Sequence, residues 1–167
     1  MKKYAMITGG TGGIGLSTAK ALGKQGYSII LNGIDEKQGE TALKQLTELG
    51  IEVETFYFDV TKEEEVLKAF EKIYSTYDHL DVLVNNAGGL GGRSRFETMT
   101  TEFYRFVLAL NLDSVFYVSR AAIPMLKKGE NASIINFASN AAWNGGGAGA
   151  GVYGTAKAGV LTLTRAL

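Results

Sequence analysis

The chain has 167 residues, enough for one domain with a sizeable core. Its 17 basic and 17 acidic residues balance, and its pI is near 6.6, so no positive charge is in excess to bind nucleic acid or an anionic membrane surface. The absence of cysteine excludes disulfides and thiolate chemistry. Met1-Lys2-Lys3 runs directly into an apolar strand, so we expect no signal peptide, no membrane span and a cytoplasmic protein.

The chain begins with a strand, a glycine-dense turn and a helix. Residues 4–7 are an apolar run of strand length, residues 8–15 read TGGTGGIG, and Ile14, Thr18 and Leu22 follow at helical spacing. Glycine lets a ligand approach the main chain, and the N-terminus of a helix favours an anion. The turn is therefore a candidate seat for a pyrophosphate, although a sharp chain reversal alone also uses glycine.

Strands and helices then alternate to the end of the chain. Apolar runs predict further strands at residues 27–31, 53–58, 80–84 and 133–137. Helical spacing predicts helices at residues 36–49, from an N-cap at Thr61 past Ile73, at 101–127, and from about Tyr153 to Leu167. This order predicts an α/β fold: a Rossmann-like, doubly wound parallel sheet in strand order 3-2-1-4-5, with helices on both faces.

Polar residues follow the carboxyl ends of several predicted strands. Asp59 ends the third strand, residues 85–88 (NNAG) follow the fourth, and Ser139 follows the fifth. In a doubly wound sheet, ligands bind at this edge, near the switch point between strands 1 and 4. These residues and the glycine turn are therefore expected to converge on one site.

Tyr153 and Lys157 are four residues apart, so on a helix they lie on one face. Free tyrosine titrates near pH ~10, and a fixed ammonium one turn away favours the phenolate that a general base requires. A pair at this spacing also occurs by chance on many solvated helices. The pair by itself leaves both interpretations open.

All these motifs together resemble the classical short-chain dehydrogenase/reductase family. The match comprises residues 8–15, Asp59, residues 85–88, Asn111, Ser139 and the Tyr153–Lys157 pair, in the family's order and approximate spacing. It runs over the whole chain. The resemblance implies an NAD(P)-dependent oxidoreductase that transfers hydride between a nicotinamide and an alcohol/carbonyl pair, with no metal.

The resemblance also implies a role for individual residues. The cofactor would be bound by the turn residues Gly9, Thr11, Gly13, Ile14 and Gly15, by Asp59 and Val60 at the adenine, by Asn86, Ala87 and Gly88 along its border, and by Tyr153 and Lys157. Tyr153 would be the general acid/base, Lys157 would favour its phenolate and hold the ribose, Ser139 would bind the substrate oxygen, and Asn111 would hold a water that links Lys157 to solvent.

Simpler interpretations exist for individual residues. Asn111 could mark a helix kink, Ser139 could start a loop, and Asp59 could cap the next helix. His79 is interpreted as a surface loop residue. Trp143, with the glycine run after it, either lines the substrate site or forms a mobile rim.

The cofactor is expected to be NAD or NADP. Family members that use NADP place a basic residue before the second glycine of the turn or after the second strand, and those positions are Gly12 and Ile34. This favours NAD, with Asp35 as the acceptor for the ribose diol.

The chain stops inside the helix that carries Tyr153 and Lys157. Classical family members continue through a sixth strand, a substrate-covering segment and a seventh strand. Residues 1–167 are therefore interpreted as one dinucleotide-binding domain, incomplete at its C-terminus, with the fifth strand at an apolar sheet edge. The alternative function is a non-catalytic dinucleotide-binding or assembly module. The resemblance further implies a homo-oligomer, dimer or tetramer, formed through the long helix and the tyrosine-bearing helix.

Overall fold

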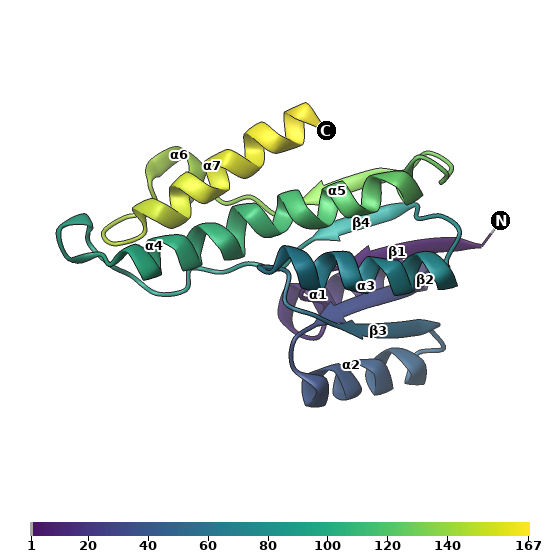
Figure 1. The fold of residues 1–167 in the computed structure, drawn as a ribbon. Coiled ribbons are helices and arrows are strands. Elements are labelled where there is room, and N and C mark those ends of the chain that lie inside the picture. Colours follow the sequence, from purple (N-terminus) through teal and green to yellow (C-terminus); the bar gives the residue numbers. More distant parts are fainter. Residues whose placement is uncertain (1) are drawn as a thin grey trace.

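The computed structural model describes residues 2–167 and contains one five-stranded parallel sheet. Its strands are β1 (Lys3–Ile7), β2 (Tyr27–Gly33), β3 (Val53–Tyr57), β4 (Val82–Asn85) and β5 (Ser133–Asn136). Their order is β3-β2-β1-β4-β5, so the predicted topology is confirmed, and β3 and β5 are the two edges. Figure 1 shows the sheet with its helices.

Helices cover both faces of the sheet. They are α1 (Gly13–Lys24), α2 (Glu36–Glu48), α3 (Glu63–Thr76), α4 (Thr101–Leu108), α5 (Ser114–Leu126), α6 (Ala141–Asn144) and α7 (Gly151–Ala166), with a short 3-10 helix, η1, at Phe96–Thr98. Side chains alternate along each strand. Met6, Ile30 and Leu83 therefore pack in a core with α3 and α5, and Ile7 and Leu31 pack in a second core with α1 and α2.

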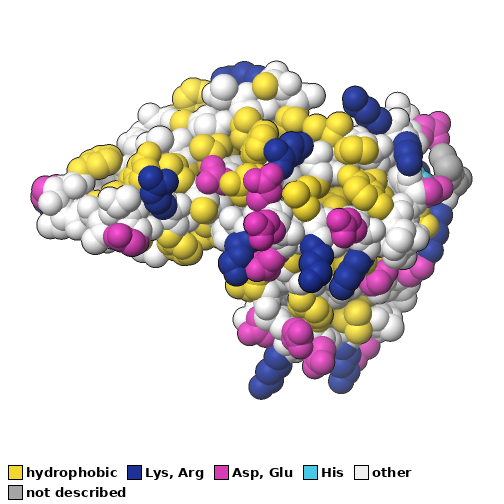
Figure 2. Space-filling view, in the orientation of Figure 1, with side chains coloured by type: hydrophobic (Ala, Val, Ile, Leu, Met, Phe, Trp, Pro, Cys, Tyr) yellow, Lys and Arg dark blue, Asp and Glu magenta, His cyan; other side chains and the backbone are white. Residues whose placement is uncertain are grey.

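One part of the molecule extends beyond the sheet. It consists of α4, α6, the first half of α7 and their loops (residues 91–108 and 139–157), and we call it the arm (Figure 1). Two aromatic side chains on the arm, Phe96 and Trp143, are each 75% exposed. Figure 2 shows hydrophobic and charged side chains on both parts, with basic and acidic side chains most numerous over the sheet-bearing part.

The predicted long helix at residues 101–127 is interrupted. A π-helical turn, η2 (Ala109–Asp113), separates α4 from α5, and the fully buried Asn111 lies within it. Such turns occur mostly as single bulges, frequently at functional sites. Pro124 lies in the last turn of α5.

The segment Thr101–Leu126 is long and apolar enough to cross a membrane by length and composition, with an 18-residue window of mean hydropathy 1.4. The sequence analysis expected no such segment. In its most apolar 18-residue window, 44% is buried inside the structure, and the core helices of soluble proteins pass the same test. Val115, Val118 and Met125 face the sheet or the neighbouring helices, so packing within the fold accounts for much of this apolar character.

Three local expectations were wrong. Thr61 does not cap α3, because its hydroxyl donates to Asp59 and the helix begins at Glu63 without a side-chain cap. The loop after β5 contains the short helix α6, which no periodic pattern signalled. His79 is 4% exposed rather than on the surface, because its ring lies against Tyr4 and its nitrogens contact Asp78 and the Lys2 carbonyl.

Candidate active site

The glycine turn between β1 and α1 is fixed by the residues that follow β4. The Thr8 hydroxyl accepts hydrogen bonds from the backbone N–H groups of Asn86 and Ala87, both at 3.1 Å. The Asn86 amide donates to the carbonyls of Thr8 (3.0 Å) and Gly9 (2.9 Å). Because these bonds cross from β1 to β4, the turn is held at the switch point of the sheet.

Asn32, at the end of β2, is a further anchor of this turn. Its side-chain oxygen accepts from the Gly9 N–H at 3.2 Å, and its amide donates to the Phe58 carbonyl at 3.0 Å. The side chain is buried, and it links the carboxyl ends of β1, β2 and β3. Asn32 was not among the predicted site residues, although its position at the end of an apolar strand is a signal for one.

At two positions of the turn, a residue other than glycine would be strained or would clash. Gly9 has a φ of +57°, and a Cβ at Gly15 would lie 2.3 Å from the Gly9 carbonyl oxygen. In contrast, a Cβ at Gly12 or Gly13 would meet nothing within 4 Å, so these residues present bare backbone to open space at the N-terminus of α1. An anionic group can approach the helix there.

Tyr153 and Lys157 lie on α7 and face the same space. The Lys157 ammonium donates to the Phe137 carbonyl at 2.8 Å and lies 5.9 Å from the centre of the Tyr153 ring. Only 3% of Lys157 is exposed, and burial lowers the pKa of its ammonium. The carbonyl at the end of β5 therefore fixes the position of a buried cation.

A cavity of about 360 Å³ joins this pair to the glycine turn. Its lining brings together the predicted residues Gly9, Ile14, Asn86, Gly88, Tyr153 and Lys157. Gly12, Gly89 and Phe137 also line it, and of these only Gly12 had been singled out, for its position in the turn. In Figure 1, β4 and β5 end at the base of the arm, and α7 begins on the arm and runs back toward the sheet.

Asn111 fastens the loop after β4 to the π-turn. Its oxygen accepts from the Gly89 N–H at 2.9 Å, and its amide donates to the carbonyls of Gly89 (2.8 Å) and Val107 (3.0 Å). A Cβ at Gly88 would lie 2.9 Å from that oxygen and 3.2 Å from the Lys157 ammonium. The close approach of both Asn111 and Lys157 to the main chain at position 88 thus requires glycine there.

The other predicted site residues lie outside this cavity. Ser139 accepts from the Ala141 N–H at 3.2 Å, at the start of α6. The Asp59 carboxylate accepts from the Thr61 N–H and hydroxyl, and Val60 is buried in the core beside α3. Asp35 caps α2 by accepting from the Gln38 N–H at 2.8 Å.

Supporting positions are taken by the remaining predicted residues. The Thr11 side chain fills the space beside Gly33, where a Cβ would lie 2.4 Å from the Thr11 methyl group. Gly15 is buried in the first turn of α1, and Ala87 packs against the core. Trp143 is absent from the cavity wall. Among residues 2–167, no group of three or more metal-ligating side chains is found.

Comparison with known proteins identifies the family of the chain. The family model described as short chain dehydrogenase matches residues 3–167. The chain belongs to this family. The family that the sequence resembles is therefore confirmed.

Curated relatives are similar over almost the whole chain. The uncharacterized oxidoreductase YxjF of Bacillus subtilis (strain 168) is 34% identical over 166 residues, which are 98% of this chain and 63% of the relative. The 3-oxoacyl-[acyl-carrier-protein] reductase FabG of Chlamydia pneumoniae is 33% identical over 99% of this chain and 66% of the relative. The chain thus spans about two thirds of the length of these relatives.

Solved structures of family members share the fold. The NADH-dependent reductase A1-R' complexed with NAD has a TM-score of 0.91 and 38% identity, over 99% of this chain and 71% of that chain. An actinorhodin polyketide ketoreductase variant with NADPH has a TM-score of 0.91 and 33% identity, over 99% of this chain and 63% of that chain. Family members with this architecture therefore bind either nicotinamide cofactor.

Proposed function

We propose that this chain is the cofactor-binding and catalytic part of an NAD(P)-dependent oxidoreductase that interconverts an alcohol and a carbonyl. The observation that supports it most strongly is the shared cavity, in which Tyr153 and the buried Lys157 ammonium face the glycine turn. The relatives' names, which are oxidoreductase and reductase, support the same class of reaction.

The residues present fit a dinucleotide. Gly12 and Gly13 leave open space at the N-terminus of α1, where the helix dipole and free N–H groups favour a pyrophosphate. Gly9, Ile14, Asn86 and Gly88 would border the cofactor toward Lys157, whose ammonium would donate to ribose hydroxyls. When bound, the nicotinamide supplies or accepts the hydride.

Proton transfer is assigned to Tyr153. In reduction its hydroxyl gives a proton to the substrate oxygen, and in oxidation its phenolate takes the proton back. Lys157 favours that phenolate through its positive charge, and the Phe137 carbonyl holds the ammonium in place. Ser139, on the loop after β5, would hydrogen-bond the substrate oxygen.

Asn111 is assigned a positioning role that extends the one implied by the family. Its side chain clamps Gly89 and the Val107 carbonyl, so the π-turn and the loop after β4 hold one arrangement beside Lys157. A water held there would connect Lys157 to solvent.

NAD is the favoured cofactor. The positions of Gly12 and Ile34 carry no basic side chain that could bind a 2′-phosphate. The Thr11 side chain fills the space beside Gly33, so no side chain at position 33 could bind the ribose. Asp35 remains the candidate diol acceptor through the carboxylate oxygen that does not cap α2. Asp59 and Val60, at the end of β3, would border the adenine. Fluorescence titration with NADH and NADPH tests this preference, and tighter binding of NADPH would contradict it.

The test of function is Tyr153→Phe, measured as oxidation of NADH with a panel of ketones and aldehydes. Loss of the hydroxyl should lower turnover by roughly 10²–10⁴-fold, while the NADH dissociation constant stays within about twofold. Tyr104→Phe, on the exposed side of α4, is the matched control. Unchanged turnover in Tyr153→Phe would remove Tyr153 from the mechanism.

The second candidate function is cofactor binding without turnover. It is favoured by the length of the chain, which covers 63% and 66% of the two curated relatives. NADH binding with no carbonyl reduced by the wild-type chain would support it. A homo-oligomeric state and a cytoplasmic location stay predictions.

A further inference from the structure

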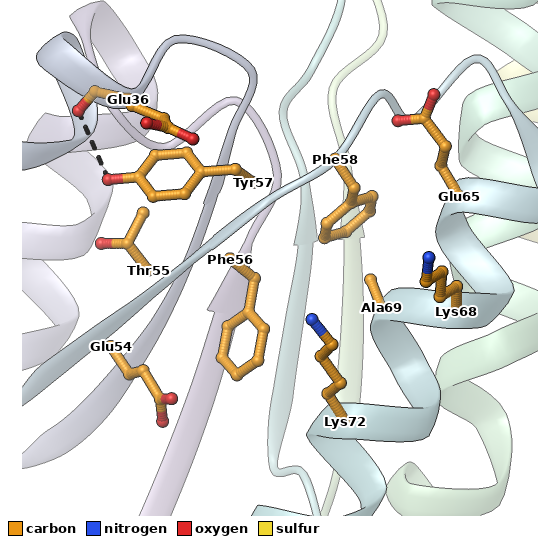
Figure 3. A pocket seen from close by; sticks show the side chains of 10 residues that line it. All are labelled: Glu36, Glu54, Thr55, Phe56, Tyr57, Phe58, Glu65, Lys68, Ala69 and Lys72. Carbon is orange, nitrogen blue, oxygen red and sulfur yellow. Dashed lines mark hydrogen bonds between the residues drawn. The ribbon is translucent and has the colours of Figure 1, made fainter.

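A second cleft, remote from the glycine turn, lies along the free edge of β3. Its volume is about 640 Å³, and α2, β3 and α3 all contribute to its wall (Figure 3). In Figure 3, β3 runs between the two helices, with Tyr57 and Thr55 toward α2 and with Phe56 and Phe58 toward α3. The cleft therefore exposes the edge of a strand between two helical walls.

The backbone of β3 has unpaired hydrogen-bonding groups on this side. The Glu52 carbonyl accepts from the Ile29 N–H, and the Phe58 N–H donates to the Gly33 carbonyl. Because peptide groups alternate in direction along a strand, those of residues 52, 54, 56 and 58 point toward β2. By alternation, the peptide groups of Val53, Thr55 and Tyr57 point outward. A sheet edge of this kind is a template for another strand.

A side chain at the centre of the cleft also lacks a partner. The Thr55 hydroxyl oxygen is buried, and among residues 2–167 it has no hydrogen-bond partner. An unpaired buried hydroxyl is costly. If the Thr55 side chain turned toward the edge, a hydroxyl placed directly opposite on an added strand would satisfy it, since cross-strand Thr–Thr pairs form hydrogen bonds.

The α3 wall adds positive charge. Within the described part of the chain, no carboxylate lies within 4.0 Å of the Lys68 or Lys72 ammonium. Figure 3 shows the Lys72 ammonium directed toward Phe56, and Glu54 two residues earlier on the same face of the strand. The cleft thus carries both a cation and an anion on the α3 side of its central residue.

We propose that this edge binds a second copy of the chain, with the two β3 strands antiparallel and Thr55 opposite the partner's Thr55. This arrangement lets the two threonines exchange both backbone hydrogen bonds and joins their hydroxyls. It also places Phe56 opposite the partner's Glu54, so that Lys72 and the partner's Glu54 form an ion pair, repeated by the two-fold axis. The result is a continuous ten-strand sheet.

A second copy suits the cleft better than an unrelated peptide because the cleft is its own complement. The outward peptide groups, the threonine hydroxyl and the lysine each find their match in the same surface after the two-fold rotation. Glu54 accepts from the Tyr77 hydroxyl through Oε2 at 2.5 Å, which leaves Oε1 for the partner's Lys72. The interface lies on β3, away from the long helix and α7. It is independent of the proposed catalytic function.

Disulfide trapping tests the register directly, because the natural chain contains no cysteine. Directly opposite residues in a hydrogen-bonded antiparallel pair have Cα atoms about 5.5 Å apart, within disulfide range. Thr55→Cys should give a covalent dimer under mild oxidation, seen on non-reducing gels. Ser133→Cys, on the opposite sheet edge at β5, is the control. No dimer from Thr55→Cys, or as much from Ser133→Cys, would overturn the proposal.

Charge reversal tests the ion pair. Glu54→Lys and Lys72→Glu should each raise the dimer dissociation constant by roughly tenfold in sedimentation velocity runs, whereas the double variant should return toward the wild-type value. Lys128→Glu, beyond the end of α5, controls for net charge. A double variant that associates no better than the single variants would overturn the proposal.

Discussion

Two glycine-rich segments of this molecule differ in what holds them. In the turn at residues 8–15, a Cβ at Gly15 would overlap the Gly9 carbonyl oxygen and the Asn86 amide, and Gly9 has a left-handed backbone and packs tightly against Ala87. In the arm loop at residues 145–149, a Cβ at Gly145 or Gly147 would meet nothing within 4 Å, and one at Gly146 or Gly149 would lie 3.0 Å from a neighbouring Cβ rather than overlap backbone. Arg93 donates to the Gly146 and Ala148 carbonyls from an exposed position. The first segment is built into the sheet, and the second rests on the surface of the arm.

The difference shows that glycine content alone does not define a binding site. Each glycine in the arm loop has a positive φ, between 71° and 77°, so glycine there relieves backbone strain. In the turn, glycine also permits close packing against β4, which leaves Gly12 and Gly13 facing open space. A preorganised ligand seat requires the second property, because binding then orders little additional backbone.

Gly15→Ala should give the largest loss of stability among variants of the two glycine-rich segments. A methyl group there would lie 2.3 Å from the Gly9 carbonyl oxygen and 2.6 Å from the Asn86 amide. We expect a loss of about 3 kcal/mol in the free energy of unfolding. Urea denaturation followed by circular dichroism measures it.

Gly12→Ala is the matched control, because its Cβ meets no atom within 4 Å and its backbone is extended, at a φ of −159°. It should unfold at nearly the wild-type urea concentration while weakening NADH binding. Equal stability of the two variants would show that the turn is not held by close packing.

Asn86→Ala should have the next largest effect. It removes two hydrogen bonds that join β4 to the turn and leaves the Thr8 and Gly9 carbonyls unpaired. The expected cost is about 2 kcal/mol of unfolding free energy. Asn144→Ala in the arm, which removes one exposed bond to the Gly146 N–H, should cost less than about 1 kcal/mol. The reverse order would contradict the comparison.

Gly147→Ala in the arm loop should cost only about 1 kcal/mol, since the sole penalty is a left-handed backbone at a φ of +77°. Its NADH dissociation constant should match that of the wild type. Thermal unfolding and fluorescence titration provide the two readings, and a tenfold loss of NADH affinity would place the arm loop in the cofactor site.

The last effect concerns pH and the buried Lys157. Burial lowers the pKa of its ammonium in the folded state, so the unfolded chain binds more protons between that lowered pKa and the ordinary value near ~10.4. Stability of the wild type relative to Lys157→Met should therefore rise with pH in this window. Urea denaturation of both proteins at several pH values tests the sign, and a relative stability that falls with pH would contradict it.

Much of the fold follows from local patterns in the sequence. Short apolar runs that alternate with helical periodicity determine the strand order, because right-handed crossovers leave few topologies. The convergence of the turn, Asn86, Gly88, Tyr153 and Lys157 follows from the same topology, since parallel strands end at one edge.

Features that depend on tertiary contacts were not accessible in this way. Burial of His79 requires Tyr4 and the Lys2 carbonyl, which are far from it in sequence. The π-turn at Asn111 depends on hydrogen bonds to Gly89, so helical periodicity across residues 101–127 could not reveal it. The α2 cap at Asp35 is a local feature, because its side chain accepts from an N–H only three residues along the chain.

The central claim is that the turn at residues 8–15 is the cofactor seat and that the arm loop is not. Hydrogen–deuterium exchange with and without NADH measures this most directly. The account predicts slower exchange on NADH binding in residues 8–17 and 86–89, with residues 145–149 unchanged. Protection confined to residues 145–149, with unchanged exchange at the turn, would contradict it.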